Sequence, residues 1–493
     1  MKKYRIRLLL IIFSFSFLFM QCSMNRFVDQ RQNHYQTIRK QIKFLISDPS
    51  LANAHIGIYV ESLKDGQIIF ENNPFKLMVP ASNMKLFTTS AALVNLGPDF
   101  RFQTPVYATG AKSDSILNGD LIIRGSGDPS ISGRWYNGDG LYVFKSWADS
   151  LKQMGITRIN GNLIGDNRYF KEPDMAEGWN WDDEPFWYSA HTSALSFNDN
   201  CIDFSVWPDS LTKSVHFSIF PLDDSIQVIN RAIVCDSASN STLEITRING
   251  KNIYLIKGML PVKADTVHES ITVEHPANYF LRILYKVLNQ KGIRITGGIK
   301  VVSDDEALDY TSAQKLFVHQ SPPLSDLIRV VNKVSHNFYA DQLLKTMGAK
   351  FNRDGSFDGG CKFVKSWLES IGVAPQYFFS VDGSGLSRKN FVAPIATATL
   401  LKTLYHHPYF KYLYDSMPVA GIDGTIRHRM KGTLAEGNVH AKTGYVQRMR
   451  ALSGYVNIGK NDPMIFVMMF NNYSVPTAEV NKIQDHICEL LAE

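Results

Sequence analysis

Residues 79–87 of the chain read VPASNMKLF, and at this point an extended run gives way to a helix-like run. Ser82 precedes Lys85 by three residues, so one helical turn places both side chains on the same face. A lysine can accept a proton from a serine when burial or nearby positive charge lowers the lysine pKa. The alternative is that Ser82 caps a helix and that Lys85 is solvated.

The Ser-x-x-Lys spacing alone is not specific, because the chain repeats it at Ser210 and at Ser312. The surroundings of Ser82 distinguish it, since Pro80 and Ala81 end the extended run and an apolar helical run follows. A serine at a helix start also has a free backbone N–H that can bind an oxyanion. Ser82 is therefore a candidate nucleophile, provided that partners for it occur elsewhere in the chain.

Two later motifs supply such partners. Ser335-His336-Asn337 opens a helix-like run, and Lys442-Thr443-Gly444 opens a strand-like run. Ser-x-Asn also occurs at two other places, whereas Lys-Thr-Gly occurs once. The order of the three motifs matches the set found in β-lactamases and penicillin-binding proteins, although this chain has His336 where that set has aspartate.

An acyl-transfer site needs a nucleophile, a proton acceptor, a proton route to the leaving amine and donors aimed at the developing oxyanion. We expect Ser82 to be the nucleophile and Lys85 to be the proton acceptor. Ser335 would relay a proton through its hydroxyl group. Asn337 would bind a substrate amide or orient Lys85.

The third motif offers groups for binding. We expect Lys442 and Thr443 to present a cation and a hydroxyl group to a substrate carboxylate. Gly444 would let a substrate backbone lie close to the strand, and the N–H of Tyr445 would be a second oxyanion donor. For Lys442 alone, a solvated strand lysine is the alternative.

The sequence predicts one helix and two strands near each end of the chain. Apolar residues recur at helical spacing over 35–45, and strand-like runs follow at 54–61 and 67–70 around an Asp-Gly turn. The C-terminal part has two strand-like runs after residue 450 and a final helix-like run over 480–490. These units predict an α+β domain in which one antiparallel sheet carries both terminal helices and the middle of the chain is an insertion.

The middle of the chain, from about residue 100 to 302, consists of many short β-like runs separated by turns rich in Gly, Asp and Asn. We therefore expect a catalytic domain formed by residues 30–98 and 303–493, with an accessory region at 99–302. This accessory region is expected to hold two nested β-rich domains, the inner one at about 203–275.

The N-terminus has the layout of an export signal. Basic residues within 1–7 precede an apolar run of 13 residues, from Leu8 to Met20, that is too short to span a bilayer. Cys22 follows this run closely, which predicts a lipoprotein signal at 1–21 and a periplasmic protein with a lipid on Cys22. Removing residues 1–21 takes away four Lys/Arg and no acid, so the formal charge falls from +6 to +2.

The composition argues against several other functions. The chain without its signal has no basic stripe with interleaved aromatic residues, so we expect no nucleic-acid partner. No Cys/His cluster has the spacing of metal ligands, so no zinc site is expected. An exported protein can form disulfides. We consider Cys201 and Cys235 as one pair, whereas Cys361 and Cys488 are interpreted as buried thiols.

With these motifs the chain resembles the low-molecular-mass class C penicillin-binding proteins, a family of serine-type D-alanyl-D-alanine carboxypeptidases and endopeptidases. The resemblance runs from about residue 35 to the C-terminus and includes the insertion. Three longer strings add to it: GSGDP at 125–129, DGSGLSR at 382–388 and PVAGIDGT at 418–425. Their glycines are expected to form tight turns that line the site.

The resemblance implies a β-lactamase/transpeptidase-like domain that acts on peptidoglycan peptides ending in D-Ala-D-Ala or on D-Ala-diaminopimelate crosslinks. It further implies that no cofactor is needed and that β-lactams acylate Ser82. Asp166, Phe170, Arg388 and Gln447 fall where contacts with the diaminopimelate side chain are expected in that family. The alternatives are a core position for Phe170 and a structural ion pair for Arg388.

Two other classes of function compete with a carboxypeptidase or endopeptidase. A β-lactamase or small-ester hydrolase can carry the same motifs, but the chain has no Glu-x-x-Leu-Asn string like that of class A β-lactamases. The long insertion is also more than such an enzyme requires. A catalytically inert wall-binding protein can keep the fold, but the motif residues are intact. The oligomeric state is left open.

Overall fold

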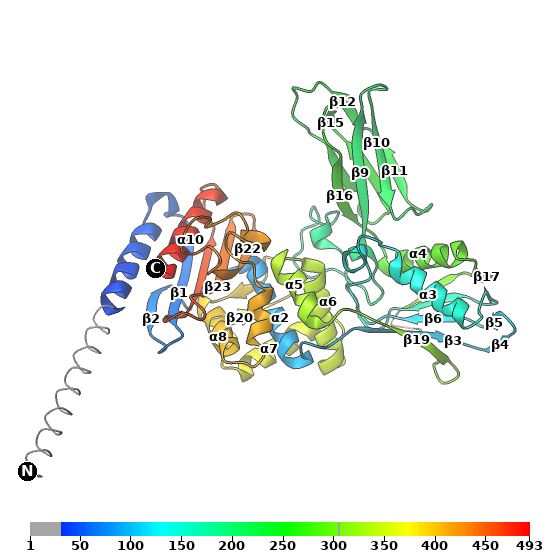
Figure 1. The fold of residues 1–493 in the computed structure, drawn as a ribbon, viewed down its shortest axis with the longest axis horizontal. Helices are drawn as coiled ribbons and strands as arrows, with labels where there is room; N and C mark the ends of the chain where they lie inside the picture. Colours follow the sequence, from blue (N-terminus) through cyan, green and yellow to red (C-terminus); the bar gives the residue numbers. More distant parts are fainter. Residues whose placement is uncertain (1–30, 304–305) are drawn as a thin grey trace, which may run out of the picture.

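The computed structural model describes residues 31–303 and 306–493. One antiparallel sheet is built from both ends of the chain, in the strand order β2-β1-β24-β23-β22 (Figure 1). β1 pairs both with its neighbour β2 and with β24 from the other terminus, so neither end of the chain forms this sheet alone. The strands are β1 (His55–Ser62), β2 (Ile68–Asn72), β22 (His440–Val446), β23 (Met449–Val456) and β24 (Met464–Asn471).

Alternate residues of β24 face opposite sides of the sheet, as the two-residue period of a strand requires. Phe466 and Met468 pack with the helix at 31–46 and with α10 (Thr477–Ala492), whereas Val467 and Met469 belong to the core on the other side. Figure 1 shows the two terminal helices side by side on one face of the sheet. The predicted α+β arrangement is confirmed.

The other face of the sheet carries the helices that hold the functional residues. α2 contacts α5, α6 and α7 and is buried continuously from Met84 to Leu93. A helix enclosed in this way can hold a charged side chain away from water. The elements of this layer are α2 (Met84–Leu96), α5 (Leu324–Lys333), α6 (Asn337–Met347), α7 (Phe357–Ser370), α8 (Pro394–Tyr405), α9 (Phe410–Ser416), β20 (Phe378–Phe379) and β21 (Phe391–Val392).

The middle of the chain forms two further sheets, in the orders β18-β8-β6-β3-β19 and β17-β7-β5-β4. We expected the insertion to end at residue 302, but β19 (Gln314–Gln320) still pairs with β3 (Gln103–Ala108), so this sheet continues beyond that boundary. The other elements are β4 (Ala111–Ser113), β5 (Ile116–Asn118), β6 (Leu121–Arg124), β7 (Arg158–Ile159), β8 (Leu163–Asp166), β17 (Arg294–Ile295), β18 (Ile299–Val302), α3 (Tyr142–Gln153) and α4 (Pro276–Gln290).

A β-rich arm projects from these sheets (Figure 1). Its strands pair in the orders β15-β12-β10-β9-β16 and β11-β14-β13. They lie between Cys201 and Thr272, in the part of the chain where an inner domain was expected at 203–275. The strands are β9 (Cys201–Asp209), β10 (Ser214–Phe220), β11 (Gln227–Asn230), β12 (Ile233–Cys235), β13 (Glu244–Arg247), β14 (Ile253–Lys257), β15 (Met259–Pro261) and β16 (Val267–Thr272).

The disulfide considered between Cys201 and Cys235 is not formed, and all cysteines within the described ranges are free. Cys201 begins β9 and Cys235 ends β12, and β10 lies between these strands. Two inter-strand spacings separate residues by about 10 Å, whereas bridged Cα atoms lie within about 7 Å. Cys361 and Cys488 are buried thiols, as predicted.

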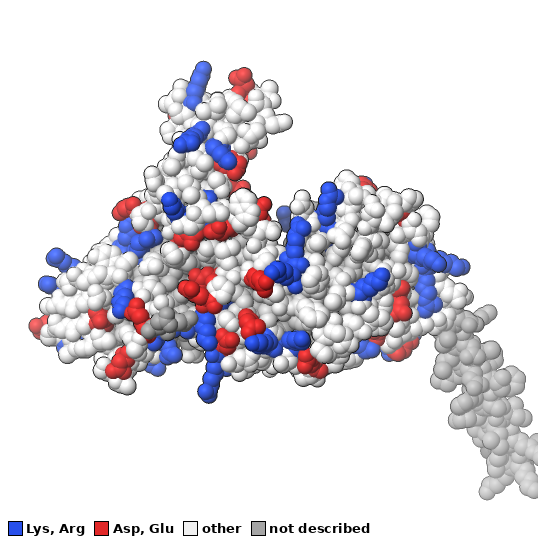
Figure 2. All heavy atoms as spheres, turned by 180° about the vertical axis from the view of Figure 1, so that it is seen from behind, with Lys and Arg blue, Asp and Glu red and all other residues white. Residues whose placement is uncertain are grey.

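Charged side chains of both signs are mixed on the face of the molecule shown in Figure 2, where Lys and Arg form no continuous stripe. Within residues 31–303 and 306–493, no helix combines the length and the apolar character that crossing a membrane requires. The predicted signal at 1–21 and the predicted lipid site at Cys22 lie outside the described residues.

Candidate active site

Ser82 lies on a short 3-10 turn, Ala81–Asn83, that leads into α2. Ala81 has a φ of 47°, a left-handed conformation that is uncommon outside glycine and costs about 1–3 kcal/mol. No side chain caps this turn or α2 by a hydrogen bond. The Ser82 hydroxyl group is therefore not used as a helix cap, and the N-cap alternative does not hold.

Lys85 is fully buried and directs its amine at Ser82. Lys85 Nζ lies 2.9 Å from Ser82 Oγ, and it donates at 2.6 Å both to Asn337 Oδ1 and to the Ser384 carbonyl. Burial lowers the pKa of Lys85 well below its usual range, because the charged form loses its hydration. Lys85 is not the solvated lysine of the alternative reading, and its neutral amine can act as a base.

Two buried carboxylates organise the loop that contacts Lys85. Asp341 on α6 accepts hydrogen bonds from the backbone N–H groups of Gly383 and Ser384 at 2.8 and 3.0 Å. Asp382 accepts two further backbone N–H groups of the DGSGLSR string. The string therefore folds into a tight loop that aims the Ser384 carbonyl at Lys85. Burial raises the pKa of Asp341.

The second motif meets the first at the start of α6. Asn337 is the first residue of this helix. Its amide oxygen accepts a hydrogen bond from Lys85, and its amide nitrogen donates to the Tyr188 carbonyl at 2.7 Å. Because both ends of the amide are bound, its orientation is fixed.

The third motif is joined to the second by a lysine. Lys442 is fully buried and donates to Ser335 Oγ at 2.8 Å. Burial, together with the positive charge of Lys85, lowers the pKa of Lys442. The next residue, Thr443, places its hydroxyl oxygen 2.8 Å from that of Thr425. Lys442 is thus a buried member of the site and not a solvated strand lysine.

The strand that carries this motif, β22, is an edge strand and contacts the turn that holds Ser82. A Cβ atom on Gly444 would lie 2.6 Å from the Pro80 carbonyl oxygen, so glycine is required for this approach. Tyr445 follows with an exposed side chain. The structure therefore brings all three motifs to one place, at the junction of the edge strand and the buried helices.

Two of the expected substrate contacts already have partners within the protein. Asp166 shares its carboxylate between Arg168 and the Tyr310 hydroxyl group. Phe170 is buried, and its ring centre is 5.3 Å from Lys345 Nζ. Lys345 belongs to the last turn of α6, about 12 Å along the helix from the catalytic end at 1.5 Å per residue. Phe170 therefore occupies a core position.

Arg388 and Gln447 have exposed side chains in loops next to the first and third motifs. Two residues that contact the second motif belong to none of the motifs in the sequence. The Tyr188 carbonyl binds Asn337, and the Trp187 ring packs edge-on against His336 with their centres 5.6 Å apart. The only signal for them in the sequence is an aromatic run at 186–188.

The family model of the D-Ala-D-Ala carboxypeptidase 3 (S13) family matches residues 38–493. The chain belongs to this family. A D-alanyl-D-alanine carboxypeptidase from Actinomadura sp. (strain R39) is 32% identical over 467 residues, which cover 92% of this chain and 84% of that protein. The recognition of the family and the prediction of a hydrolase of the carboxypeptidase class are confirmed.

Solved structures support the same fold for this S13 family member. The crystal structure of penicillin binding protein 4 from Haemophilus influenzae is 28% identical, with a TM-score of 0.79, and the match covers 92% of this chain and 99% of that chain. A second structure of that protein, complexed with a novel β-lactam, is 27% identical with a TM-score of 0.75 and the same coverage. The predicted β-lactamase/transpeptidase-like fold class is confirmed.

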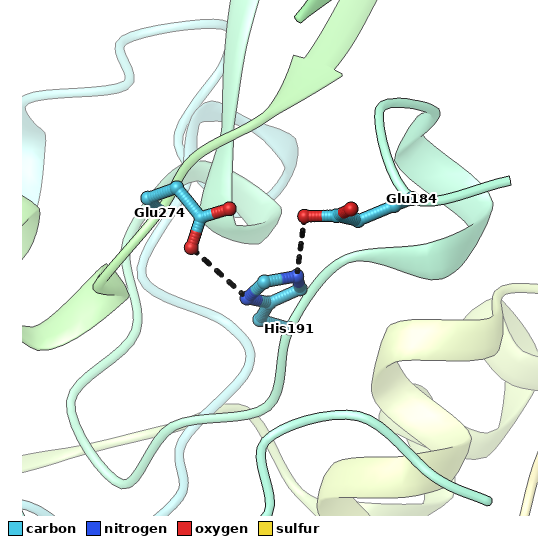
Figure 3. Close-up of side chains that lie close together, drawn as sticks. All are labelled: Glu184, His191 and Glu274. Carbon is cyan, nitrogen blue, oxygen red and sulfur yellow. Dashed lines mark ion pairs between the residues drawn. The ribbon is translucent and has the colours of Figure 1, made fainter. Parts of the chain in front are cut away.

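One cluster in this S13 enzyme has the residue types of a metal site. Glu184, His191 and Glu274 place ligand atoms within 4.8 Å of one another (Figure 3). The fully buried Arg247 donates to both carboxylates, and its guanidinium group supplies the positive charge between them. Burial lowers the pKa of His191 to about 4, so the ring is neutral at pH 7. We interpret the cluster as a buried ion-pair network and not as a metal centre.

Proposed function

We propose that this enzyme hydrolyses D-alanyl-D-alanine ends and D-Ala-diaminopimelate crosslinks of peptidoglycan stem peptides through an acyl-enzyme on Ser82. The observation that carries the proposal is the 2.9 Å contact between Ser82 Oγ and the fully buried Lys85 Nζ. A buried amine whose pKa is lowered is neutral at a lower pH than an ordinary lysine, and a neutral amine can take the proton of a serine.

In the proposed acylation step, Ser82 Oγ attacks the carbonyl carbon of the penultimate D-Ala while its proton passes to Lys85 Nζ. The backbone N–H groups of Ser82 and Tyr445 would hold the tetrahedral oxyanion. The C–N bond then breaks, and the proton held by Lys85 passes through the Ser335 hydroxyl group to the leaving amine, which leaves Lys85 neutral. The hydrogen bond from Lys442 to Ser335 Oγ supports this relay, because it orients the hydroxyl group.

Water would complete the reaction. Neutral Lys85 accepts a proton from the water that attacks the ester carbonyl, the bond to Ser82 Oγ breaks, and that oxygen takes a proton back. The shortened peptide leaves, and the free enzyme is restored. The hydrogen bond between Lys85 and Asn337 supports both half-reactions, because it keeps the amine beside Ser82 in each.

We expect the substrate to bind along β22. An edge strand has unpaired backbone groups that can pair with an extended peptide. Lys442 and Thr443 lie on this strand beside the turn that holds Ser82, and we propose that they bind the terminal carboxylate of the substrate. Gly444 would allow the peptide backbone to lie flat against the strand.

Of the four residues expected to contact a substrate side chain, we retain Arg388 and Gln447, because their side chains are exposed. Arg388 belongs to the DGSGLSR loop, and Gln447 follows β22 directly. Asp166 and Phe170 already have partners of their own within the protein. We therefore place the side-chain subsite between the DGSGLSR loop and the end of β22.

We further propose that residues 30–98 and the part of the chain that follows β19 form the catalytic domain, with the accessory region between them. We also propose that the protein is exported to the periplasm with a lipid on Cys22. The export signal in the sequence supports this location, and so does a substrate that lies outside the cytoplasmic membrane. Incorporation of labelled fatty acid into the protein, lost in Cys22→Ala, would test the lipid anchor.

The proposed activity is tested by incubating the purified protein with pentapeptide muropeptides, with crosslinked dimers and, separately, with a fluorescent penicillin. Release of D-Ala or of monomers, abolished in Ser82→Ala, is expected, and the two rates give the balance of carboxypeptidase and endopeptidase activity. The matched control is Ser312→Ala, which removes the exposed serine of another Ser-x-x-Lys string. Rapid β-lactam hydrolysis without muropeptide cleavage would indicate a β-lactamase, and no reaction with either would indicate an inert wall-binding protein.

A further inference from the structure

Three consecutive residues of the inserted region have an unusual backbone. Asn198, Asp199 and Asn200 have φ values of 51°, 54° and 54°, in the left-handed region that residues other than glycine rarely occupy, and hardly ever three in a row. Such conformations persist where the surrounding structure fixes them, and they cluster at functional sites.

Side-chain hydrogen bonds fix this segment from both sides. The Asn200 side chain accepts from the Phe197 N–H at 3.1 Å and donates to the His191 carbonyl at 2.8 Å. The Asn198 side chain donates to Asp203 Oδ2 at 3.0 Å. The two asparagines therefore hold the backbone in place, and the residue between them is presented in a defined direction.

The presented residue, Asp199, binds the middle residue of the second motif. Its Oδ2 lies 3.0 Å from His336 Nε2 and 2.9 Å from Arg134 Nη2. The His336 side chain is only 4% exposed, so the contact is made in a buried position. His336 is also the residue in which this chain departs from the aspartate of the usual motif.

His336 lies between two residues of the site, so its contact with Asp199 affects both of them. The residue before it, Ser335, has a φ of 61° and binds Lys442. The residue after it, Asn337, binds Lys85. A displacement of His336 therefore moves two side chains of the site at once, because they are its direct neighbours.

We propose that Asp199 is a positioning residue for the second motif, which it fixes through His336 so that Ser335 and Asn337 meet the two lysines of the site. This inference rests on the proposed function of those residues. It gives the inserted region a direct part in catalysis, since Asp199 belongs to that region.

A neighbouring cleft offers space into which the His336 ring can move. The pair lines a cleft of about 790 Å³, together with Arg134, Trp187 and Asp203. Without the bond to Asp199, the imidazole ring can turn toward this open space. Loss of the bond should therefore disturb the site while the fold stays intact.

The test uses Asp199→Ala and His336→Phe in the full protein, alone and combined. The phenylalanine keeps the aromatic packing of His336 but cannot donate a hydrogen bond. We expect each single variant to lower the rate of acylation by a fluorescent penicillin about tenfold to hundredfold. The double variant should be no slower than the slower single variant, because both remove the same contact. Asp199→Asn, which keeps an acceptor oxygen, should retain most of the rate.

The matched control is Asp223→Ala, which breaks another buried aspartate–arginine pair of the insertion, with Arg282. It should leave the acylation rate within about twofold of the unmodified protein, the scatter expected for a site without contact to the motif. Hydrogen–deuterium exchange of the backbone around 335–337 should rise in Asp199→Ala and not in this control.

Unchanged acylation and unchanged exchange in Asp199→Ala would overturn the proposal, and so would strictly additive effects in the double variant. If Asp199→Ala does not fold, His336→Phe decides the same question from the other side of the pair. Absence of penicillin labelling in the unmodified protein would count against the proposed function instead, and the exchange measurement still decides whether Asp199 positions the motif.

Discussion

Lys85 Nζ donates a 2.6 Å hydrogen bond to Asn337 Oδ1, although the two residues are 252 positions apart in the chain. The bond joins the buried face of α2 to the start of α6 in the helical layer. Because the Asn337 amide is also bound to a backbone carbonyl, it cannot turn its nitrogen toward the lysine. The amine is thereby held beside Ser82 in a fully buried position, and this burial lowers its pKa.

The lowered pKa of Lys85 predicts the pH dependence of acylation. The amine acts as a base only when neutral, so the rate should be low at acidic pH and rise as the pH increases through the lowered pKa. The midpoint should lie well below about 10.4, the ordinary value for lysine. Stopped-flow acylation by a chromogenic β-lactam between pH 5 and 9 measures it.

Lys85→Arg is the matching variant, since a guanidinium group stays protonated at every pH of this range. It should lose about a thousandfold or more of the acylation rate, within the range for loss of a general base. Lys402→Met, which removes a half-exposed lysine paired with Glu61, is the control. A rate that is independent of pH, or an active arginine variant, would show that Lys85 is not the base.

Gly444→Ala tests the close approach of β22 to the Ser82 turn. The added Cβ atom would lie 2.6 Å from the Pro80 carbonyl oxygen, so the strand must move away from the turn. We expect acylation to fall about tenfold to hundredfold and the free energy of unfolding to fall by about 1–3 kcal/mol. Gly298→Ala, where nothing lies within 4 Å of the new atom, should change neither. An unaffected Gly444→Ala enzyme would mean that the strand need not lie this close.

Much of this fold is readable from the sequence because its signals are local. The strand-like runs after residue 450 and the helical spacing at both termini predict the sheet and the helices that cover it, and both are found. The end of the insertion is not readable in this way. β19 belongs to the sheet of β3 through pairing across more than 200 residues. No local pattern in the sequence near residue 303 predicts this pairing.

Some residues of the site can be predicted from the sequence, and others are found only in the structure. Ser82, Lys85 and Lys442 are visible in the sequence because their side chains carry the chemistry. The Tyr188 carbonyl acts through the backbone, which every residue type has, so no sequence pattern marks it. Asp341 is one buried carboxylate among many acidic residues, and its role depends on the loop that folds over it.

The buried His191 predicts a loss of stability in acid. Burial lowers its pKa to about 4 in the folded protein, against about 6.5 when unfolded. The free energy of unfolding is therefore unaffected by His191 above pH 6.5. It falls as the pH decreases toward 4, by up to about 3 kcal/mol, because the unfolded protein binds the proton more readily. His191→Gln should flatten this part of the profile of thermal unfolding against pH, whereas His216→Gln, at a half-exposed position, should not. Identical slopes in the two variants would contradict the assignment.

Arg247→Met should destabilise the inserted region strongly. The fully buried guanidinium group is the partner of both Glu184 and Glu274, and its removal leaves two carboxylates that are little exposed without a counter-charge. Breaking a buried ion pair in this way costs about 3–5 kcal/mol, so the thermal midpoint should fall by several degrees. Adding Glu184→Gln and Glu274→Gln should restore part of the loss, because the unpaired charges are then gone. A midpoint that does not change in Arg247→Met would mean that the network is not a stabilising one.

The proposed function depends on acylation of Ser82. The most direct measurement is mass spectrometry of the protein after incubation with benzylpenicillin, followed by peptide mapping. We expect one covalent adduct, located on the peptide that contains Ser82, absent in Ser82→Ala and retained in Ser312→Ala. An adduct on another residue, or a folded unmodified protein that forms none, would contradict it.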